Sequence, residues 1–355
     1  MNFRPGVLIG DEVTELFNYA KVNNFAIPAV NVIGTNSINA TLEAAKQVES
    51  PVIIQVSNVA AQFLGGSSLP NTNQETSTAG AVSLALHVRQ VVHLYGVSVI
   101  LHTDHANRQV LPWVDSLLKE NRIYFERTGE PLFSSHMLDL SIEPLMENIS
   151  TSCAYLKKMR EFNLNLEIEL GVTGGVEDGL DHLGIDSESL YTKPDEVATA
   201  YEHLTAISKN FTIAASFGNV HGVYNPGNIG LKPKILENSQ NIIQEKYNTK
   251  RNPVNFVFHG GSGCTKEEIH EAIAYGTVKM NINTDLQWAF WSGIRDYYLQ
   301  NENYLQSQIG SSNGNKEVSN KPYYNPMAWL RKGENSFVKR LIKTFEDLNC
   351  VGRNK

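Results

Sequence analysis

Eight short apolar runs alternate along this chain with segments of helical spacing, and this alternation restricts the possible folds more than any other feature. The runs begin at Ala26, Val52, Val97, Leu132, Leu164, Phe211, Val254 and Thr277. Strands joined through helices run parallel, because each helix returns the chain to the same edge of the sheet. Eight such units predict the α/β class and a (β/α)8 TIM barrel, with residues 1–355 as a single domain. A doubly wound open sheet is the alternative, and it would concentrate its site at one switch point.

Between these runs, apolar residues recur at the spacing of amphipathic helices. The segments concerned are 11–23, 36–49, 80–95, 111–118, 146–162, 194–209, 234–247, 265–275, 286–299 and 336–348. Thr265 and Glu268 form a capping-box pattern at the start of one of them. Stretches rich in glycine or polar residues predict irregular structure: a loop at 59–80, mobile loops at 171–190 and 218–230, and a polar insertion at 300–320.

The charge and the cysteine content exclude several classes of protein. A net charge of -7 without a basic stripe argues against a protein that binds nucleic-acid phosphates. The beginning of the chain has only a short apolar run before its first acidic residues, so it predicts neither a signal peptide nor a membrane anchor. The three cysteines, Cys153, Cys264 and Cys350, lack CxxC spacing, which argues against a disulfide framework and favours the cytoplasm.

Three histidines, His105, His221 and His259, each stand just after a different predicted strand. In a barrel the carboxyl ends of the strands converge, so the three imidazoles can meet at one zinc ion and leave its fourth position open. Glu169 shares a strand face with Glu167 and is a candidate further ligand or a partner that orients a histidine. Position alone leaves ordinary packing and loop roles for these residues equally open.

Two glycine-rich turns, at 260–263 and 218–227, follow the seventh and the sixth strand. Backbone N–H groups crowd together in such turns, and a helix starts at Thr265, so this region can hold a phosphate. Further neutral donors after the eighth strand are Asn281, Asn283 and Thr284. Ordinary tight-turn chemistry is the alternative for all of them.

Six sequence blocks follow one another along the chain: LHTDH, LFSSHMLDLS, LEIELGVTGGVEDG, SFGNVHGVYNPGN, NFVFHGGSG and VKMNINTD. In this order and spacing they resemble the class II, metal-dependent fructose-1,6-bisphosphate aldolases of the longer bacterial and fungal type. The resemblance covers essentially the whole chain. It implies a homodimeric lyase that cleaves fructose 1,6-bisphosphate reversibly to dihydroxyacetone phosphate and glyceraldehyde 3-phosphate in glycolysis and gluconeogenesis. The implied partner is thus a small phosphosugar, with neither nucleic acid nor membrane.

The resemblance also implies the metal sites. It implies one catalytic zinc ion, a possible second divalent site, and a monovalent cation, Na⁺ or K⁺, beside the phosphate. The implied metal ligands are His105, His221 and His259, with Glu169 as a further or alternative ligand and Asp139 as a support. The backbone positions implied for the monovalent cation are Val220, Gly222 and Gly260.

Substrate and catalytic residues follow from the same resemblance. The implied substrate-binding residues are Asn31, Ser57, Gly222, Gly260, Ser262, Asn281, Asn283, Thr284 and Lys321. Asp104 is implied as the acid/base for the hydroxyl beside the scissile carbon–carbon bond, and Glu177, on the 171–190 loop, as the base that takes a proton from dihydroxyacetone phosphate. A positioned base contributes about 10²–10⁴-fold, so an electrophile is also required. No lysine stands at these strand ends to form a Schiff base, and zinc fills that role.

The chain departs from the family pattern at two positions. It has Asn283 where the family usually has aspartate, and Met327 where the family has an arginine that grips the distal phosphate. Methionine offers neither charge nor donor, so Lys321, or a shifted Arg331, would have to keep the phosphate affinity. This departure leaves open an aldolase for a related ketose such as tagatose 1,6-bisphosphate. A relative that binds metal and phosphate without catalysis is the other alternative.

Overall fold

The computed structural model describes residues 3–177, 180–182, 191–221, 231–261, 264–310 and 317–354. For 174–177, 180–182, 220 and 221 it describes the backbone alone.

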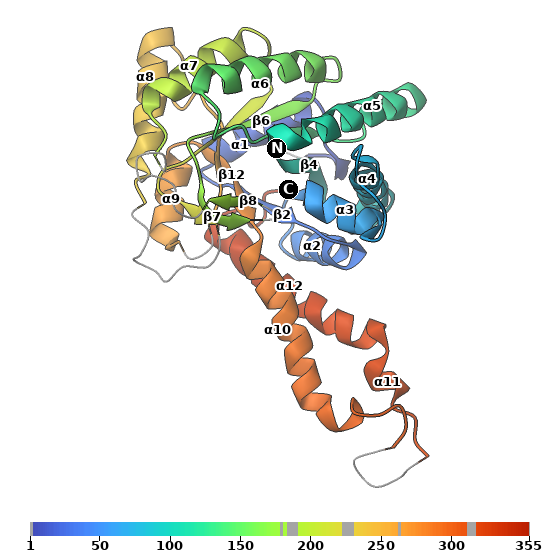
Figure 1. Cartoon of the computed structure of the whole chain (residues 1–355). Coiled ribbons are helices and arrows are strands. Elements are labelled where there is room, and N and C mark those ends of the chain that lie inside the picture. Colours follow the sequence, from blue (N-terminus) through green and yellow to red (C-terminus); the bar gives the residue numbers. More distant parts are fainter. Residues whose placement is uncertain are drawn as a thin grey trace.

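Within the described residues, eight parallel strands close into a barrel, which confirms the predicted (β/α)8 fold (Figure 1). The strands are β2 (Ile27–Asn31), β3 (Val52–Ser57), β4 (Ser98–Ala106), β5 (Ser135–Leu138), β6 (Asn165–Leu170), β9 (Phe211–Ala215), β11 (Phe256–Phe258) and β12 (Thr277–Ile282). They are neighbours in chain order, and β12 pairs in parallel with β2 to close the ring. The carboxyl ends of all eight strands therefore share one end of the barrel.

Helices surround the barrel, as the spacing of apolar residues predicts. They are α1 (Asp11–Val22), α2 (Thr35–Gln47), α3 (Asn58–Gly66), α4 (Glu75–Tyr95), α5 (Leu111–Thr128), α6 (Leu145–Arg160), α7 (Pro194–Thr205), α8 (Lys234–Tyr247), α9 (Lys266–Ala274), α10 (Thr284–Asn301), α11 (Lys321–Tyr324) and α12 (Pro326–Asp347), with short 3-10 turns η1 (Arg108–Val110) and η2 (Glu302–Tyr304). The capping box at α9 is confirmed, because Thr265 accepts from the backbone N–H of Glu268 and Glu268 accepts from that of Thr265.

Four short strands of the described residues lie outside the ring. β1 (Gly6–Val7) pairs in parallel with the start of β4. β7 (Gly174–Glu177) and β8 (Leu180–His182) form an antiparallel pair within the predicted 171–190 loop, and β10 (Val220–His221) lies beside β7. The rest of both predicted mobile loops, at 178–179, 183–190 and 222–230, lies outside the described residues.

The predicted irregular loop at 59–80 is too long, because only residues 67–74 lie outside helices. Residues 58–66 form α3, and α4 begins at Glu75 rather than near Gly80. The glycines that suggested a loop let the two helices approach closely: a Cβ on Gly80 would lie 1.8 Å from the carbonyl oxygen of Ala61, and one on Gly65 would lie 2.1 Å from that of Thr76. These glycines therefore serve helix packing, which composition alone does not reveal.

A segment near the carboxyl terminus, made of α10, η2, α11 and the first half of α12, extends away from the barrel as an arm (Figure 1). The predicted helix at 336–348 is too short, because α12 begins at Pro326, where the side chain of Asn325 accepts from the backbone N–H of Met327. The two long helices approach closely at Gly293, where a Cβ would lie 2.3 Å from the carbonyl oxygen of Lys332. The predicted polar insertion joins α10 to α11 and α12, and an antiparallel β-bridge pairs Ile309 with Ser319. Residues 311–316 lie outside the described residues.

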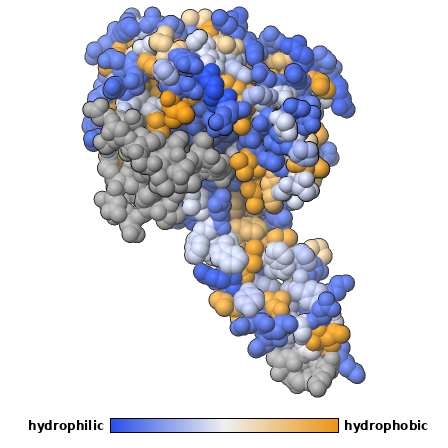
Figure 2. Space-filling model, viewed as in Figure 1, coloured by the Kyte–Doolittle hydropathy of each residue, from blue (hydrophilic) through white to orange (hydrophobic). Residues whose placement is uncertain are grey.

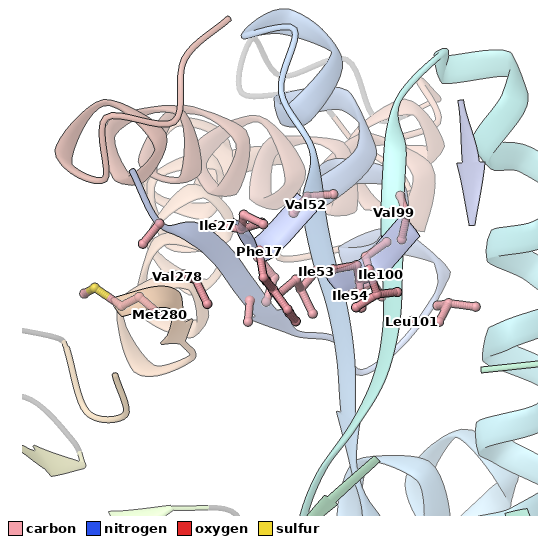
Figure 3. Packing of buried hydrophobic residues seen from close by; sticks show 14 of the residues in the cluster. Phe17, Ile27, Val52, Ile53, Ile54, Val99, Ile100, Leu101, Val278 and Met280 are labelled. Atoms are coloured by element: carbon pink, nitrogen blue, oxygen red, sulfur yellow. The ribbon is translucent and has the colours of Figure 1, made fainter. Parts of the chain in front are cut away.

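Buried aliphatic side chains hold the strands to their helices. Figure 3 shows side chains such as Ile27, Val52, Ile54 and Val99 packed together where β2, β3 and β4 run side by side. Polar side chains also lie inside the barrel. Lys279 on β12 contacts Glu167 on β6, and because these strands are not neighbours in the ring, the contact crosses the barrel. The site is built on this polar interior.

Candidate active site

The predicted chemical residues gather at the carboxyl ends of the barrel strands. Asp104 and His105 lie near the end of β4, Asp139 directly follows β5, and Glu169 lies near the end of β6. His259 directly follows β11. The side chains of all five residues are at least nine-tenths buried. Residues far apart in the sequence therefore meet because parallel strands end at one face.

His105, Glu169 and His259 form a compact cluster whose potential ligand atoms all lie within 4.8 Å of one another. Glu169 Oε2 lies 3.3 Å from His259 Nδ1 and 3.7 Å from His105 Nδ1. Asp139 Oδ2 lies 3.3 Å from His105 Nδ1. His105 has a φ of 44°, a left-handed conformation that is rare for a non-glycine residue and typical of functional sites.

This cluster fits a divalent metal ion. Thr173 Oγ1 donates to Glu169 Oε1 at 2.7 Å, whereas the buried Oε2 atom has no hydrogen bond within the described residues. A buried carboxylate oxygen that faces two imidazoles but makes no hydrogen bond is well placed to bind a cation. Two imidazoles and a carboxylate are a ligand set that binds zinc in proteins. Catalytic zinc sites keep one further coordination position open.

The other nitrogen of His259 contacts a second buried carboxylate. His259 Nε2 lies 3.1 Å from Glu167 Oε1, so its Nδ1 is left for the cluster. Burial by itself lowers the pKa of His259, but the carboxylates of Glu169 and Glu167 raise it to about 9. A metal ion would displace that proton, because a ligating imidazole is neutral.

Glu167 in turn is held by a buried ammonium. Lys279 Nζ donates to both oxygens of Glu167, at 2.8 and 2.7 Å, and His102 Nε2 lies 3.7 Å from Glu167 Oε2. Burial by itself raises the pKa of Glu167, but Lys279 and the two imidazoles hold it well below its usual value. Glu167 therefore remains a carboxylate and fixes the orientation of His259.

Asp104 lies beside the cluster and accepts hydrogen bonds from three side-chain amides. Asn31 Nδ2 and Gln55 Nε2 each donate to Asp104 Oδ2 at 2.9 Å, and Asn281 Nδ2 donates to Oδ1 at 3.3 Å. Asp104 Oδ1 lies 3.9 Å from His105 Nε2. These donors hold one buried carboxylate in a fixed orientation next to the candidate metal position, which suits a group that accepts a proton from a bound ligand.

Comparison with known proteins agrees with this arrangement. Residues 11–353 match the protein family described as Fructose-bisphosphate aldolase class-II. The chain belongs to the class II fructose-bisphosphate aldolase family. It is 56% identical over 352 residues to a fructose-bisphosphate aldolase of Campylobacter jejuni, covering 99% of this chain and 98% of that one. The prediction of an enzyme of this class is thus confirmed.

One further relative and one solved structure support the same assignment. Fructose-bisphosphate aldolase class 2 of Escherichia coli (strain K12) is 52% identical over 349 residues, covering 98% of this chain and 97% of that one. The crystal structure of fructose-bisphosphate aldolase from Campylobacter jejuni matches with a TM-score of 0.90 at 55% identity, covering 99% of this chain and 98% of that one. In the described residues of this family member, no helix has the length and apolar character needed to cross a membrane.

Several residues that the aldolase resemblance implies lie near the cluster. Gly260 follows His259 with a φ of 62°, a conformation that favours glycine. Ser57 ends β3, is paired in register with Asp104, and caps α3 by accepting from the backbone N–H of Ala60. Asn283 and Thr284 stand at the start of α10, whose N-terminus favours an anion.

Other implied residues are not brought to the cluster or are not described. Gly222 and Ser262 lie outside the described residues, as do the side chains of Glu177, Val220 and His221. The backbone nevertheless pairs Gly175 with His221, so β7 of the predicted lid runs beside the strand that carries the third histidine.

Lys321 and Arg331 are the cations that the sequence offers in place of the arginine missing at position 327. Lys321 begins α11 and Met327 lies in the first turn of α12, both on the arm and away from the barrel (Figure 1). Arg331 pairs with Glu43 of α2 at 2.7 Å and with Glu334 at 3.0 Å, so two carboxylates hold its guanidinium.

Gln55, Asn219 and Lys279 are site residues that the sequence analysis missed. Gln55 and Lys279 each interrupt an otherwise apolar strand, which was the available signal. Asn219 donates to the backbone oxygen of His259 at 2.8 Å and joins the segment before β10 to the cluster. Its role depends on a contact between distant segments, which no local pattern reveals.

Proposed function

We propose that this protein catalyses the reversible, zinc-dependent cleavage of fructose 1,6-bisphosphate to dihydroxyacetone phosphate and glyceraldehyde 3-phosphate, in glycolysis and gluconeogenesis. The observation that carries this proposal is the buried cluster of His105, Glu169 and His259 with Asp104 at its side. The identity of 52% and 56% to named aldolases supports the substrate. We also propose that residues 1–355 form one domain and that the protein is cytoplasmic, which its three free cysteines support.

His105, His259, Glu169 and His221 would hold the zinc ion, with Asp139 orienting His105. When bound, zinc supplies Lewis-acid stabilisation of the negative charge that develops on the substrate's carbonyl oxygen. A possible second divalent ion would share this cluster. The backbone of Val220, Gly222 and Gly260 would hold a monovalent cation, Na⁺ or K⁺.

Asp104 accepts the proton of the hydroxyl next to the scissile carbon–carbon bond, and the amides of Asn31, Gln55 and Asn281 keep its carboxylate in place. In the reverse reaction, the condensation, Glu177 takes the proton from dihydroxyacetone phosphate. The position of Glu177 on β7, beside β10, supports this assignment. The hairpin of β7 and β8 then excludes water from the reacting carbon when it closes.

The phosphate and hydroxyls of dihydroxyacetone phosphate bind at the strand ends next to the cluster. The residues proposed for this role are Asn31, Ser57, Gly222, Gly260, Ser262, Asn281, Asn283 and Thr284. The start of α10, an 18-residue helix, supports this position because the unpaired backbone N–H groups of a helix N-terminus favour negative charge.

The function is tested by steady-state cleavage of fructose 1,6-bisphosphate and tagatose 1,6-bisphosphate, before and after treatment with a chelator. We expect metal-dependent cleavage with a preference for the fructose sugar. An equal or reversed preference would favour the related ketose as substrate, which Met327 motivates. Binding of both sugars without cleavage of either would instead favour a non-catalytic relative.

The Asp104→Asn variant is expected to lower kcat by about 10²-fold, because asparagine cannot accept the proton. It should still bind zinc, since Asp104 lies outside the cluster of His105, Glu169 and His259. Metal content and kcat are measured together, with Asp195→Asn, at an exposed position of α7, as the matched control. Unchanged kcat in Asp104→Asn would contradict the assignment.

We propose further that the protein is a homodimer whose arms meet the partner subunit. The arm exposes large apolar side chains, with Trp288 60% and Trp291 53% exposed, and Figure 2 shows apolar residues along its surface. Exposed apolar patches mark protein interfaces, and aromatic residues are enriched there. Because Lys321 lies on the arm, it can bind substrate only at another subunit's site.

Mixing two impaired variants tests this arrangement. Lys321→Ala alone should lower kcat/KM about 10-fold or more, through loss of a charged hydrogen bond. Co-expressed with Asp104→Asn, it should regain about a quarter of wild-type activity, because half of the dimers are mixed and each mixed dimer has one intact site. The control is Asp104→Asn co-expressed with His259→Ala. Both residues belong to the same barrel, so each site of a mixed dimer carries one of the two changes and activity should not recover. If Lys321→Ala with Asp104→Asn also fails to recover, Lys321 acts within its own chain.

A further inference from the structure

A cavity of about 520 Å³ opens at the amino-terminal end of the barrel, opposite the candidate active site. Asn255, which directly precedes β11, lines this cavity, whereas His259 directly follows the same strand. Residues from α1, from the end of α7 and from the segment after α8 complete the lining. Figure 1 shows α7 and α8 side by side on the outside of the barrel. The cavity volume falls in the range of about 300–1,000 Å³ that is usual for small-molecule sites.

The charges that line this cavity all have the same sign. Its cationic residues are Lys21, Lys209, Lys250 and Arg251, and none of the described residues that line it is acidic. Within the described part of the chain, none of these cations forms an ion pair. The chain as a whole carries a net charge of -7, so this local excess of positive charge is not a property of its average composition. Clefts lined by one sign of charge attract ligands of the opposite sign.

Lys21 is the cation that the fold holds most firmly. It is partly buried, and its Nζ donates to Asn255 Oδ1 at 2.7 Å. Burial lowers the pKa of Lys21 to about 8, and no carboxylate offsets this effect. An ammonium held in a partly buried position by a neutral amide favours binding of an anion, which would restore the lost solvation.

Two hydroxyl groups in the lining have no hydrogen-bond partner among the described residues. The Oγ1 atoms of Thr205 and Thr249 are buried and form no hydrogen bond with the described residues. Buried polar atoms are nearly always hydrogen-bonded, so each such exception requires an explanation. Phe211 and Val254 provide an apolar surface in the same cavity. The lining thus combines cations, hydroxyl donors and apolar area.

We propose that this cavity is a second ligand site, separate from the active site, which binds a small phosphorylated metabolite. Lys21 and the cations at 209, 250 and 251 contact the phosphate, with Thr205 and Thr249 as neutral donors. The apolar lining contacts the organic part of the ligand. The site does not depend on the proposed catalytic function, because it shares no residue with the cluster.

Isothermal titration calorimetry with three probes tests the proposal: ATP, glucose 6-phosphate and pyrophosphate. Excess Mg²⁺ keeps the probes from stripping metal from the protein. We expect at least one probe to bind about 10-fold or more weakly to Lys21→Met than to wild type, since a charged hydrogen bond is lost. The matched control is Lys119→Met, which removes the same charge at an exposed position of α5 and should leave the affinity unchanged.

Phosphate binding at the active site contributes equally to Lys21→Met and Lys119→Met, so their difference reports on the cavity. If Lys21→Met weakens the binding of all three probes, the cavity recognises the phosphate alone. If it weakens the binding of ATP only or of glucose 6-phosphate only, the organic part of that probe is recognised as well. Arg251→Gln, at an exposed position, should weaken the binding of the same probe. It replaces Lys21→Met in this experiment if Lys21→Met fails to fold. Equal affinities in wild type and both cavity variants, or no binding of any probe at millimolar concentration, would overturn the proposal.

Discussion

His259→Ala is expected to lower kcat/KM for fructose 1,6-bisphosphate by about 10³-fold and to remove most of the bound metal. The loss follows from geometry: His259 Nδ1 lies 3.3 Å from Glu169 Oε2, at the centre of the candidate metal cluster. Without this imidazole, His105 and Glu169 are the only members of the cluster left among the residues whose side chains are described. Removal of one preorganised electrostatic group typically costs about 10²–10³-fold, and loss of the metal adds to it.

Elemental analysis of the purified protein and steady-state kinetics measure the two effects together. The matched control is His203→Ala, an exposed histidine on α7, which should retain both metal and activity. A His259→Ala protein with full metal content and full activity would refute the metal site. A protein that keeps its metal but loses activity would instead assign His259 a role in positioning substrate.

Lys279→Met is expected to lower the free energy of unfolding by about 3–5 kcal/mol, because it leaves the carboxylate of Glu167 buried without its cation. Both residues are about 1% exposed, and the two hydrogen bonds between them, at 2.7 and 2.8 Å, cross the barrel interior. Methionine has nearly the length of lysine, so the cavity term is small. Urea denaturation followed by circular dichroism measures the change.

The double variant Lys279→Met with Glu167→Leu is the control for this prediction. Replacing both members of a buried pair with apolar residues is often neutral, so the double variant should regain much of the stability that Lys279→Met loses. The same variant should bind metal less tightly, because Glu167 no longer holds His259 at 3.1 Å. A change of less than about 1 kcal/mol in Lys279→Met would contradict a structural role for the pair.

The barrel could be predicted from local sequence because its elements have clear local patterns. The helix at 234–247 was predicted with the bounds that α8 has, and the capping box at Thr265 lies where the sequence placed it. Such patterns report hydrophobic periodicity and helix capping, which depend on residues only a few positions apart. The position of His105 and His259 at strand ends followed from the same patterns.

The parts of the site that were missed depend on contacts across the barrel. Gln55 contacts Asp104 from a neighbouring strand, and Lys279 contacts Glu167 from the opposite wall. A polar residue in an apolar strand signals only that something must pair with it, not which residue does. The prediction for residues 59–80 failed for a related reason. Gly80 allows two helices to pack closely and does not form a turn.

By itself, the sequence determined the order of strands and helices, the family, and the strand ends that carry chemical side chains, because these depend on local periodicity and on short motifs in register. Tertiary structure alone decided which side chains meet: the partners of Asp104 and His259, the separation of Lys321 from the site of its own chain, and the cationic lining of the cavity at the opposite end. Residues that are far apart in the chain come into contact only when the strands close into a barrel, because closure brings the strand ends together.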